Sequence, residues 1–322
     1  RLVGSEMCIR DRYSSRPSAR AGRAPKGGIC CMRLITFSEG GIARVGLLKE
    51  DESIVDLSKV SAGLPRDMLS VIELGSPAIA EISEAEREDS HFGLSEVVLE
   101  PVILRPPKII GIGLNYKAHA EESNMDLPEV PLVFTKQSTS VSGPYSPIYW
   151  SEEGKVMDYE GELGIVIGRK CRRVPKENAK DVIFGYTIGN DVSVRDWQVR
   201  GTPPSFTMGK SWDSHCPLGP GIVVDPSLDP HELHLQTWVN DELRQDTMTN
   251  DLIFNCYELI EFLSTAFTLE PGDVILTGTP SGVGMAQKPP TLLKPGDRLS
   301  LIHISEPTRR YAISYAVFCL KK

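Results

Sequence analysis

Acidic side chains at the ends of two predicted strands are the first candidates for chemistry. In the segment DYEGELGIVIG, Asp158, Glu160 and Glu162 alternate along the chain, so on a strand they face the same side. Asp191 follows a second apolar run, YTIGN. Crowded carboxylates repel one another unless a cation lies between them, and oxygen ligands suit hard ions such as Mg²⁺, Mn²⁺ or Ca²⁺. The alternatives are a solvated strand face for the first group and a helix N-cap for Asp191.

A histidine and a glutamate three residues apart form a second candidate. His119 and Glu122 in GIGLNYKAHAEES meet on one face if the segment is a helix. A carboxylate beside an imidazole raises its basicity and fixes its tautomer, which is the usual arrangement of a general base. The alternative is an ordinary exposed His–Glu pair. A dinucleotide site is not indicated, because the pattern G-x-G-x-x-G is absent.

Basic side chains and a glycine-rich loop could hold an anion. Arg195 could pair with Asp196 or with a substrate carboxylate, whose shape its planar fork fits. Lys210 lies in a glycine-flanked turn and could neutralise an oxyanion, although a lone lysine is usually on the surface. The loop LTGTPSGVG, residues 276–284, is rich in backbone N–H groups that suit an anion.

Composition narrows the possible partners. The chain has 322 residues and a formal net charge of −8, which argues against nucleic-acid and membrane-surface partners, since these call for a Lys/Arg-rich face. No apolar run approaches the roughly 20 residues needed to span a bilayer. The seven cysteines form no C-x-x-C pair, so they indicate reduced thiols in a cytoplasmic protein rather than a zinc site.

Short β-prone runs separated by turns make up most of the chain. A small N-terminal domain is predicted over 32–105, with strands followed by helices near 64–73 and 77–86. Prolines then mark a linker, and the remainder, 106–302, alternates strands and turns with few helices. One of these helices is predicted to begin after Asp251, acting as its N-cap. The fold class that follows is a β-rich α+β protein.

The two ends of the chain differ from the rest. Residues 1–31 are rich in arginine and serine, as a transit peptide is, but this segment and residues 303–322 both resemble translated adaptor sequence. We therefore predict a non-native extension at each end, with Met32 as the native start. A native closing strand after LKPGDRLSL would then be missing, and an unpaired sheet edge is expected.

Five motifs taken together are far more specific than any one of them. In chain order they are NYxxHxxE, DYEGELGxVIG, GNDVSxRDWQ, GKSWDxxCPLGP and TGTPxGVG. The set resembles the fumarylacetoacetate hydrolase family over 106–302, and GVGMAQKPPTLLKPGD is similar to the subgroup with a small N-terminal domain. The resemblance implies a mixed β-sandwich or roll for the catalytic domain, and a homodimer.

The resemblance also implies roles for single residues. The family's metal ligands match Glu160, Glu162 and Asp191, and its catalytic pair on a lid helix matches His119 and Glu122. The family's further catalytic residue, a lysine, matches Lys210. Its substrate-binding residues match Arg195, Gln198 and Thr279. The implied cofactor is Mg²⁺, with Mn²⁺ or Ca²⁺ as alternatives.

The activity implied by the resemblance is a Mg²⁺-dependent hydrolysis of a carbon–carbon bond in a 2,4-dioxo acid, which releases pyruvate or a related 2-oxo acid. The same site could serve an oxaloacetate-type decarboxylase or a 2-hydroxy-dienedioate isomerase, because all three reactions pass through an enolate. An alternative of another class is a metal-binding protein that has lost turnover. The predicted partner is therefore a small 2-oxo acid, and the predicted location is the cytoplasm.

Overall fold

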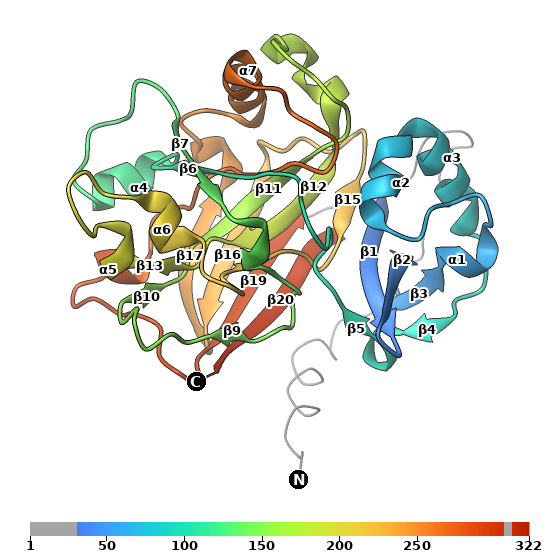
Figure 1. The fold of residues 1–322 in the computed structure, drawn as a ribbon, viewed down its shortest axis with the longest axis horizontal. Coiled ribbons are helices and arrows are strands. Elements are labelled where there is room, and N and C mark those ends of the chain that lie inside the picture. The colour runs from blue at the N-terminus through green and yellow to red at the C-terminus, as the bar shows by residue number, and fades with distance from the viewer. Residues whose placement is uncertain (1–30, 306–310, 322) are drawn as a thin grey trace.

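The computed structural model describes the backbone of residues 31–305 and 311–321 and the side chains of residues 31–301 (Figure 1). The predicted N-terminal extension lies outside the described residues, apart from Cys31. Strands dominate, and the helices are short. The prediction of a β-rich α+β fold is confirmed. Among the described residues, no helix is both long and apolar enough to cross a membrane.

An antiparallel meander opens the described chain and carries three helices. The hairpin between its first two strands turns on Gly40 and Gly41, both at positive φ, a conformation that glycine adopts without steric cost. The strands are β1 (Met32–Glu39), β2 (Ile42–Leu48), β3 (Ser53–Asp56), β4 (Phe92–Gly93) and β5 (Val98–Leu99). The helices are α1 (Leu57–Val60), α2 (Met68–Leu74) and α3 (Ser76–Ala85), with the 3₁₀ turn η1 (Leu94–Glu96).

A mixed sheet of eleven strands runs through the molecule (Figure 1). Its order is β4-β3-β2-β1-β15-β12-β11-β18-β6-β7, with β5 beside β1. The strands beyond the meander are β6 (Ile109–Gly113), β7 (Leu132–Lys136), β11 (Gly161–Ile167), β12 (Ile183–Asn190), β15 (Ile222–Val224) and β18 (Val274–Leu276). Because β1 pairs with β15, the N-terminal strands continue the sheet that contains β11 and β12.

A second sheet has the order β17-β16-β19-β20-β9. Its strands are β9 (Ile148–Tyr149), β16 (Leu233–Val239), β17 (Glu242–Met248), β19 (Arg298–Ser305) and β20 (Tyr311–Lys321). A buried apolar cluster that includes Ile188, Leu235 and Leu301 joins this sheet to β12. Since β19 pairs with β16 on one side and β20 on the other, the unpaired edge expected after this strand is not found.

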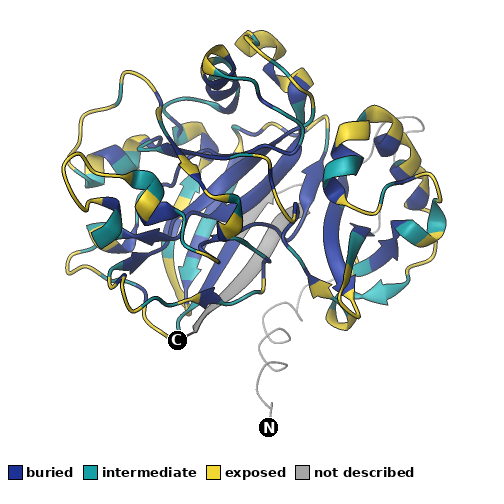
Figure 2. Ribbon diagram, in the orientation of Figure 1, coloured by how far each residue is buried: buried dark blue, intermediate teal, exposed yellow. Residues whose placement is uncertain are grey.

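Short elements fill the connections, and burial concentrates in the strands between them (Figure 2). The helices are α4 (Lys117–Glu122), α5 (Arg195–Gln198), α6 (Phe206–Lys210) and α7 (Cys256–Ala266). The short strands are β8 (Val141–Ser142), β10 (Met157–Asp158), β13 (Ser193–Val194) and β14 (Cys216–Pro217). The 3₁₀ turns are η2 (Ser138–Ser140), η3 (Lys176–Val182), η4 (Thr249–Asp251) and η5 (Gly284–Ala286).

The start of α7 differs from the prediction. The helix begins at Cys256, and Asn255 caps it by accepting two backbone hydrogen bonds from the first turn. Asp251 is therefore not its N-cap. Instead, Asp251 Oδ2 accepts a hydrogen bond from the backbone N–H of Ala118 in α4 at 3.1 Å. Apolar residues continue through the connection between η4 and α7, so the apolar pattern alone placed the start of the helix too early.

Candidate active site

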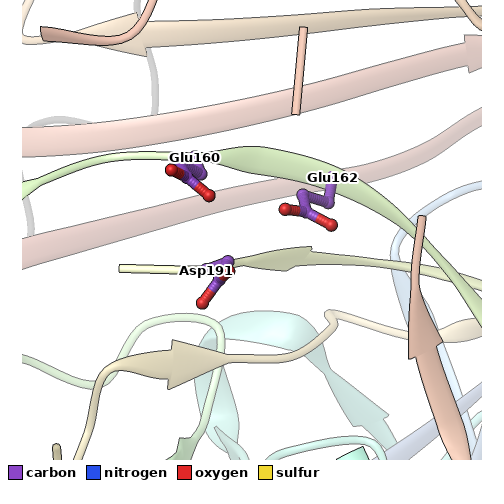
Figure 3. A group of neighbouring side chains, drawn as sticks. All are labelled: Glu160, Glu162 and Asp191. Carbon is purple, nitrogen blue, oxygen red and sulfur yellow. The ribbon is translucent and has the colours of Figure 1, made fainter. Parts of the chain in front are cut away.

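The three predicted metal ligands lie together at the ends of two neighbouring strands (Figure 3). Glu160 precedes β11, Glu162 is the second residue of β11, and Asp191 directly follows β12. The two strands are antiparallel, with Gly161 opposite Asn190, and this register brings the three carboxylates to one place. One oxygen of each lies within 4.8 Å of the others, and all three residues are buried. We call this group the acidic floor.

Burial and connectivity exclude the alternative interpretations of these residues. A solvated strand face does not apply, because the residues of the acidic floor are at most 5% exposed. Asp191 is not a helix N-cap, since α5 begins at Arg195 and follows Val194. Asp158 does not join the floor. Its carboxylate instead accepts hydrogen bonds from two backbone N–H groups at the start of η5.

The acidic floor fits a divalent ion. Opposite ligands of an octahedral Mg²⁺ lie about 4.2 Å apart, twice a bond of about 2.1 Å, so oxygens within 4.8 Å of one another need to move little. Charge supports the same conclusion. Burial, followed by the nearby carboxylates of Asp191 and Glu160, raises the pKa of Glu162 well above its usual range. Burial and the two neighbouring carboxylates thus disfavour a charge on Glu162, and a divalent cation would relieve that cost.

Lys210 lies against the floor. Its Nζ is 2.5 Å from Glu160 Oε2 and 2.8 Å from Asp191 Oδ2, and the residue is 2% exposed. The alternative of a surface lysine is therefore wrong. Burial by itself would raise the pKa of Glu160, but Lys210 and Arg195 outweigh burial and lower that pKa to about 2. Glu160 is thus held as a carboxylate.

A second lysine, Lys136 at the end of β7, is a site residue that the motifs do not single out. Its Nζ lies 2.6 Å from Asp191 Oδ1, and both side chains are fully buried. It also donates to the backbone carbonyl of Lys210. One signal in the sequence could have identified it. Phe134 and Lys136 lie two residues apart on one strand, so their side chains point to the same face, and a buried Phe134 implies that Lys136 also points into the protein.

Arg195 is held by three acceptors on different elements. Its Nε and Nη2 lie 3.0 and 2.8 Å from Asp158 Oδ2, and its Nη1 lies 2.6 Å from Glu160 Oε1. Nη1 also donates to Gln198 Oε1 at 3.0 Å. The pairing with Asp196 that the sequence left open is not found, because that carboxylate accepts from the backbone of the segment before β10. The structure thus brings Arg195 and Gln198 together beside the floor.

The predicted catalytic pair lies on α4. His119 Nδ1 is 2.7 Å from Glu122 Oε1, and the two side chains are 13% and 20% exposed. We call these two residues the lid pair. They are not an ordinary exposed pair, because Glu122 Oε2 accepts a hydrogen bond from the backbone N–H of Gly282 at 2.9 Å. His119 and Glu160 line one cavity, so the lid pair and the acidic floor border the same space.

The glycine-rich loop that was predicted to suit an anion receives carboxylates of the chain itself. Its backbone N–H groups donate to Glu162 at 2.7 Å, to Glu122 at 2.9 Å and to Asp158 at 2.8 Å. Gly282 has a φ of 102°, and a Cβ at this position would stand 2.0 Å from the carbonyl oxygen of Arg244. The loop therefore fixes the floor and the lid pair relative to each other, and Gly282 is needed for its path.

Thr279 lies in the same loop, and its hydroxyl is already engaged. Oγ1 donates to the carbonyl of Gly161 at 3.1 Å and accepts from Gln245 Nε2 at 2.7 Å. Gln245 is fully buried and also accepts a hydrogen bond from Gly161 N at 3.0 Å. Thr279 lines the cavity, and its role in substrate binding stays a prediction.

The cavity between floor and lid has a volume of about 150 Å³. Polar and charged side chains form one part of its wall, namely His119, Ser123, Glu160, Arg195, Gln198, Lys210 and Thr279. Apolar side chains form another part, among them Met125, Leu132, Phe134 and Phe206. The space is therefore suited to a small molecule with a charged or polar end.

Comparison with known proteins agrees with this geometry. The sequence model described as fumarylacetoacetate (FAA) hydrolase C-terminal matches residues 108–306. The chain belongs to the fumarylacetoacetate hydrolase family. Among its relatives in this family, oxaloacetate tautomerase YisK of Bacillus subtilis is 43% identical over 277 residues, which cover 80% of this chain and 91% of that protein. The mitochondrial oxaloacetate tautomerase fahd2 of Xenopus laevis is 41% identical over 271 residues, covering 83% and 85%.

Solved structures of the fumarylacetoacetate hydrolase family share the fold. A maleylpyruvate hydrolase from Sphingobium sp. SYK-6, in complex with manganese(II) ion and pyruvate, has a TM-score of 0.73 at 30% identity and covers 90% of this chain and 100% of its own. A 2-hydroxyhepta-2,4-diene-1,7-dioate isomerase from Mycobacterium marinum has a TM-score of 0.69 at 30% identity, covering 90% and 98%. The predicted family and fold are confirmed. The relatives and structures named here are a tautomerase, a hydrolase and an isomerase, so membership of the family does not by itself identify the reaction.

Proposed function

We propose that this protein is a divalent-metal-dependent enzyme that interconverts the keto and enol forms of a small 2-oxo acid, with oxaloacetate as the leading substrate. The observation that carries the proposal is the placement of the His119–Glu122 pair and the acidic floor around one cavity. The names of the relatives in Bacillus subtilis and Xenopus laevis support the same reaction. The family resemblance implies hydrolysis, which becomes the second candidate.

The lid pair provides the proton transfer. Glu122 holds Nδ1 of His119, which leaves Nε2 without a partner among the described residues. Nε2 can take a proton from the carbon beside a keto group and deliver it to the keto oxygen, which gives the enol, or carry a proton from that oxygen back to the carbon, which restores the keto form. A carboxylate on Nδ1 stabilises the imidazolium that forms in between.

The charges of the site suit an anionic substrate. Buried or nearly buried carboxylates outnumber cations by one, the carboxylates being Asp158, Glu160, Glu162 and Asp191 and the cations Lys136, Arg195 and Lys210. A divalent ion such as Mg²⁺ or Mn²⁺, held by the acidic floor, supplies electrophilic stabilisation of negative charge on an oxygen. With its two charges, the balance becomes one positive charge, which attracts a 2-oxo carboxylate.

The test follows the enol absorbance of oxaloacetate with protein that has been stripped by chelator and reloaded with Mg²⁺. The rate should appear only with the ion, and His119→Ala should lower it by about 10²- to 10⁴-fold, the usual worth of a general acid–base group. A rate that His119→Ala leaves unchanged contradicts the proposed proton transfer. No activity on any of a panel of 2-oxo acids would favour a catalytically silent metal-binding protein.

Hydrolysis of a carbon–carbon bond is the second candidate, and one comparison favours it. The maleylpyruvate hydrolase of similar fold was solved with manganese(II) ion and pyruvate. For this reaction the lid pair would deprotonate a water rather than a substrate carbon. Release of pyruvate from acetylpyruvate, abolished by His119→Ala, would establish this reaction. A variant that loses hydrolysis but still decarboxylates oxaloacetate would show two reactions on one site.

Two further features belong to the proposal and are tested separately. The family resemblance predicts a homodimer, which the mass of the protein in solution would establish. The scattered cysteines predict a cytoplasmic location, whereas the name of the Xenopus laevis relative places that protein in mitochondria.

A further inference from the structure

Each carboxylate of the acidic floor has one oxygen held by a donor other than Lys210, whereas Lys210 Nζ lies against the second oxygen of both Glu160 and Asp191. The donors come from three different elements. The pairs are Arg195 Nη1 to Glu160 Oε1 at 2.6 Å, Gly278 N to Glu162 Oε2 at 2.7 Å, and Lys136 Nζ to Asp191 Oδ1 at 2.6 Å.

This arrangement bears on which ion the floor accepts. Ca²⁺ takes six to eight oxygens at about 2.3–2.6 Å and readily uses both oxygens of a carboxylate, whereas Mg²⁺ requires a near-ideal octahedron at about 2.1 Å. A carboxylate whose second oxygen holds a fixed hydrogen bond offers only one oxygen. Three such ligands suit a small octahedral ion and leave a larger ion short of ligands.

Lys136 is the most informative of the three donors. The N–H of Gly278 belongs to the backbone, and Arg195 also contacts Asp158 and lines the cavity. Lys136 is fully buried, and within the described part of the chain it is not among the residues that line the cavity, while the hydrogen bonds of its Nζ go to Asp191 and to the carbonyl of Lys210. Its one direct contact with a carboxylate of the floor is therefore with Asp191, and its contact with Lys210 is to the backbone.

We propose that Lys136 is a positioning residue that makes the acidic floor selective for Mg²⁺ and Mn²⁺ over Ca²⁺, because it keeps Asp191 a one-oxygen ligand. The inference rests on the proposed metal-dependent function. An ion that binds Asp191 through Oδ2 displaces Lys210 Nζ from that oxygen, and once Lys136 is removed Oδ1 is free to join Oδ2 on the ion. A larger ion then gains an oxygen that the wild-type protein withholds, while the octahedral ion loses an oriented ligand.

The experiment compares dissociation constants for Mg²⁺ and Ca²⁺ by titration calorimetry in wild-type protein, Lys136→Met and Lys108→Met. Lys108 is the matched control, because its Nζ also pairs with a buried carboxylate, Asp273, at 2.9 Å but away from the floor. The preference for Mg²⁺ should fall by about tenfold or more in Lys136→Met, the usual effect of losing an outer partner of a ligand, and stay unchanged in Lys108→Met.

The outcomes separate the two proposals. Wild-type protein that binds Mg²⁺ with a preference unaltered by Lys136→Met overturns the role of Lys136 and leaves the enzyme proposal standing. Wild-type protein that binds neither ion overturns both. If Lys136→Met does not fold, a crystal structure of wild-type protein with Mn²⁺ decides: Asp191 bound through Oδ2 alone supports the inference, and Asp191 bound through both oxygens overturns it.

Discussion

The acidic floor and the lid pair border one cavity but are built in opposite ways. The floor lies at the ends of β11 and β12, inside an eleven-stranded sheet, and its residues are at most 5% exposed. The lid pair lies on α4, a helix of six residues with an exposed outer side (Figure 2). A helix this short does not persist by itself, so a few contacts from distant parts of the chain must hold it.

Those contacts can be named. Glu122 accepts from Gly282, Asp251 accepts from the first turn of α4, and Asn115, just before the helix, bonds to the carbonyls of Thr277 and Phe254. The position of the ion site is therefore determined by the register of β11 and β12, whereas the position of His119 is determined by a few hydrogen bonds that single substitutions can remove. Changes to the floor should therefore abolish chemistry, and changes around the lid should tune it.

The largest effect is expected from Glu162→Gln. Glu162 has no ion-pair partner among the described residues, and Gln can still accept from Gly278 N. The variant should lose ion binding and lower the rate by about 10³-fold, since an ion's charge stabilisation is worth several kcal/mol and each ~1.4 kcal/mol is tenfold in rate. Its free energy of unfolding without ion should not fall, because burial disfavours the charge at this position.

Rate, ion affinity and urea unfolding of Glu162→Gln are compared with those of Glu270→Gln, which removes a carboxylate remote from the floor. A fully active Glu162→Gln, or one that is markedly less stable, contradicts the view that this carboxylate serves the ion rather than the fold.

The second effect concerns His215, which supports the floor. Its carbonyl accepts from Val192 N, directly after Asp191, and its Nε2 donates to the carbonyl of Tyr149 at 3.0 Å. Burial lowers the pKa of His215 to about 4, against about 6.5 in the unfolded chain. The unfolded state therefore takes up a proton first. The neutral His215 side chain therefore contributes roughly 3 kcal/mol to the free energy of unfolding above pH 6.5. This contribution is lost as the pH falls from 6.5 toward 4.

Urea unfolding of wild-type protein and His215→Gln between pH 7.5 and 4.5 checks this prediction. The variant should be less stable at pH 7.5 but lose less stability on acidification. Parallel pH curves for the two proteins would show that His215 is not the group responsible.

The smallest effect is expected at the lid. Asp251→Ala removes the acceptor for Ala118 N and should cost about 1 kcal/mol, as the loss of a helix cap does. Amide hydrogen exchange should accelerate in α4, and KM should rise more than kcat falls. Asp67→Ala is the matched control, since Asp67 caps α2 by accepting from Ser70 N at 2.9 Å. Equal amide exchange rates in α4 for both variants would show that Asp251 does not stabilise this helix.

The same contrast explains what the sequence could predict. Alternation along one strand identified Glu160 and Glu162, and a three-residue spacing identified His119 and Glu122, because both signals are local. Lys136 meets Asp191 across 55 residues of sequence, and Glu122 meets Gly282 across 160. No local pattern marks such pairs, so they depend on how the sheet and the loop pack.

Fold elements show the same limit. The β-rich class and the hairpin at Gly40–Gly41 follow from short-range patterns, whereas the pairing of β1 with β15, which joins residues 32–34 to 222–224, has no local signal. The start of α7 was misplaced because Asp251 caps a helix that is far away in sequence. The origin of the residues beyond 302 stays a prediction, although their backbone completes the second sheet as β20.

The keto–enol reaction that we propose requires the acidic floor to hold one divalent ion. The most direct measurement titrates chelator-stripped protein with Mn²⁺, counting bound ion by electron paramagnetic resonance and following the rate in the same samples. We expect one tightly bound ion per chain and a rate that rises in proportion to the occupancy of the site. Full activity in the ion-free protein would contradict it.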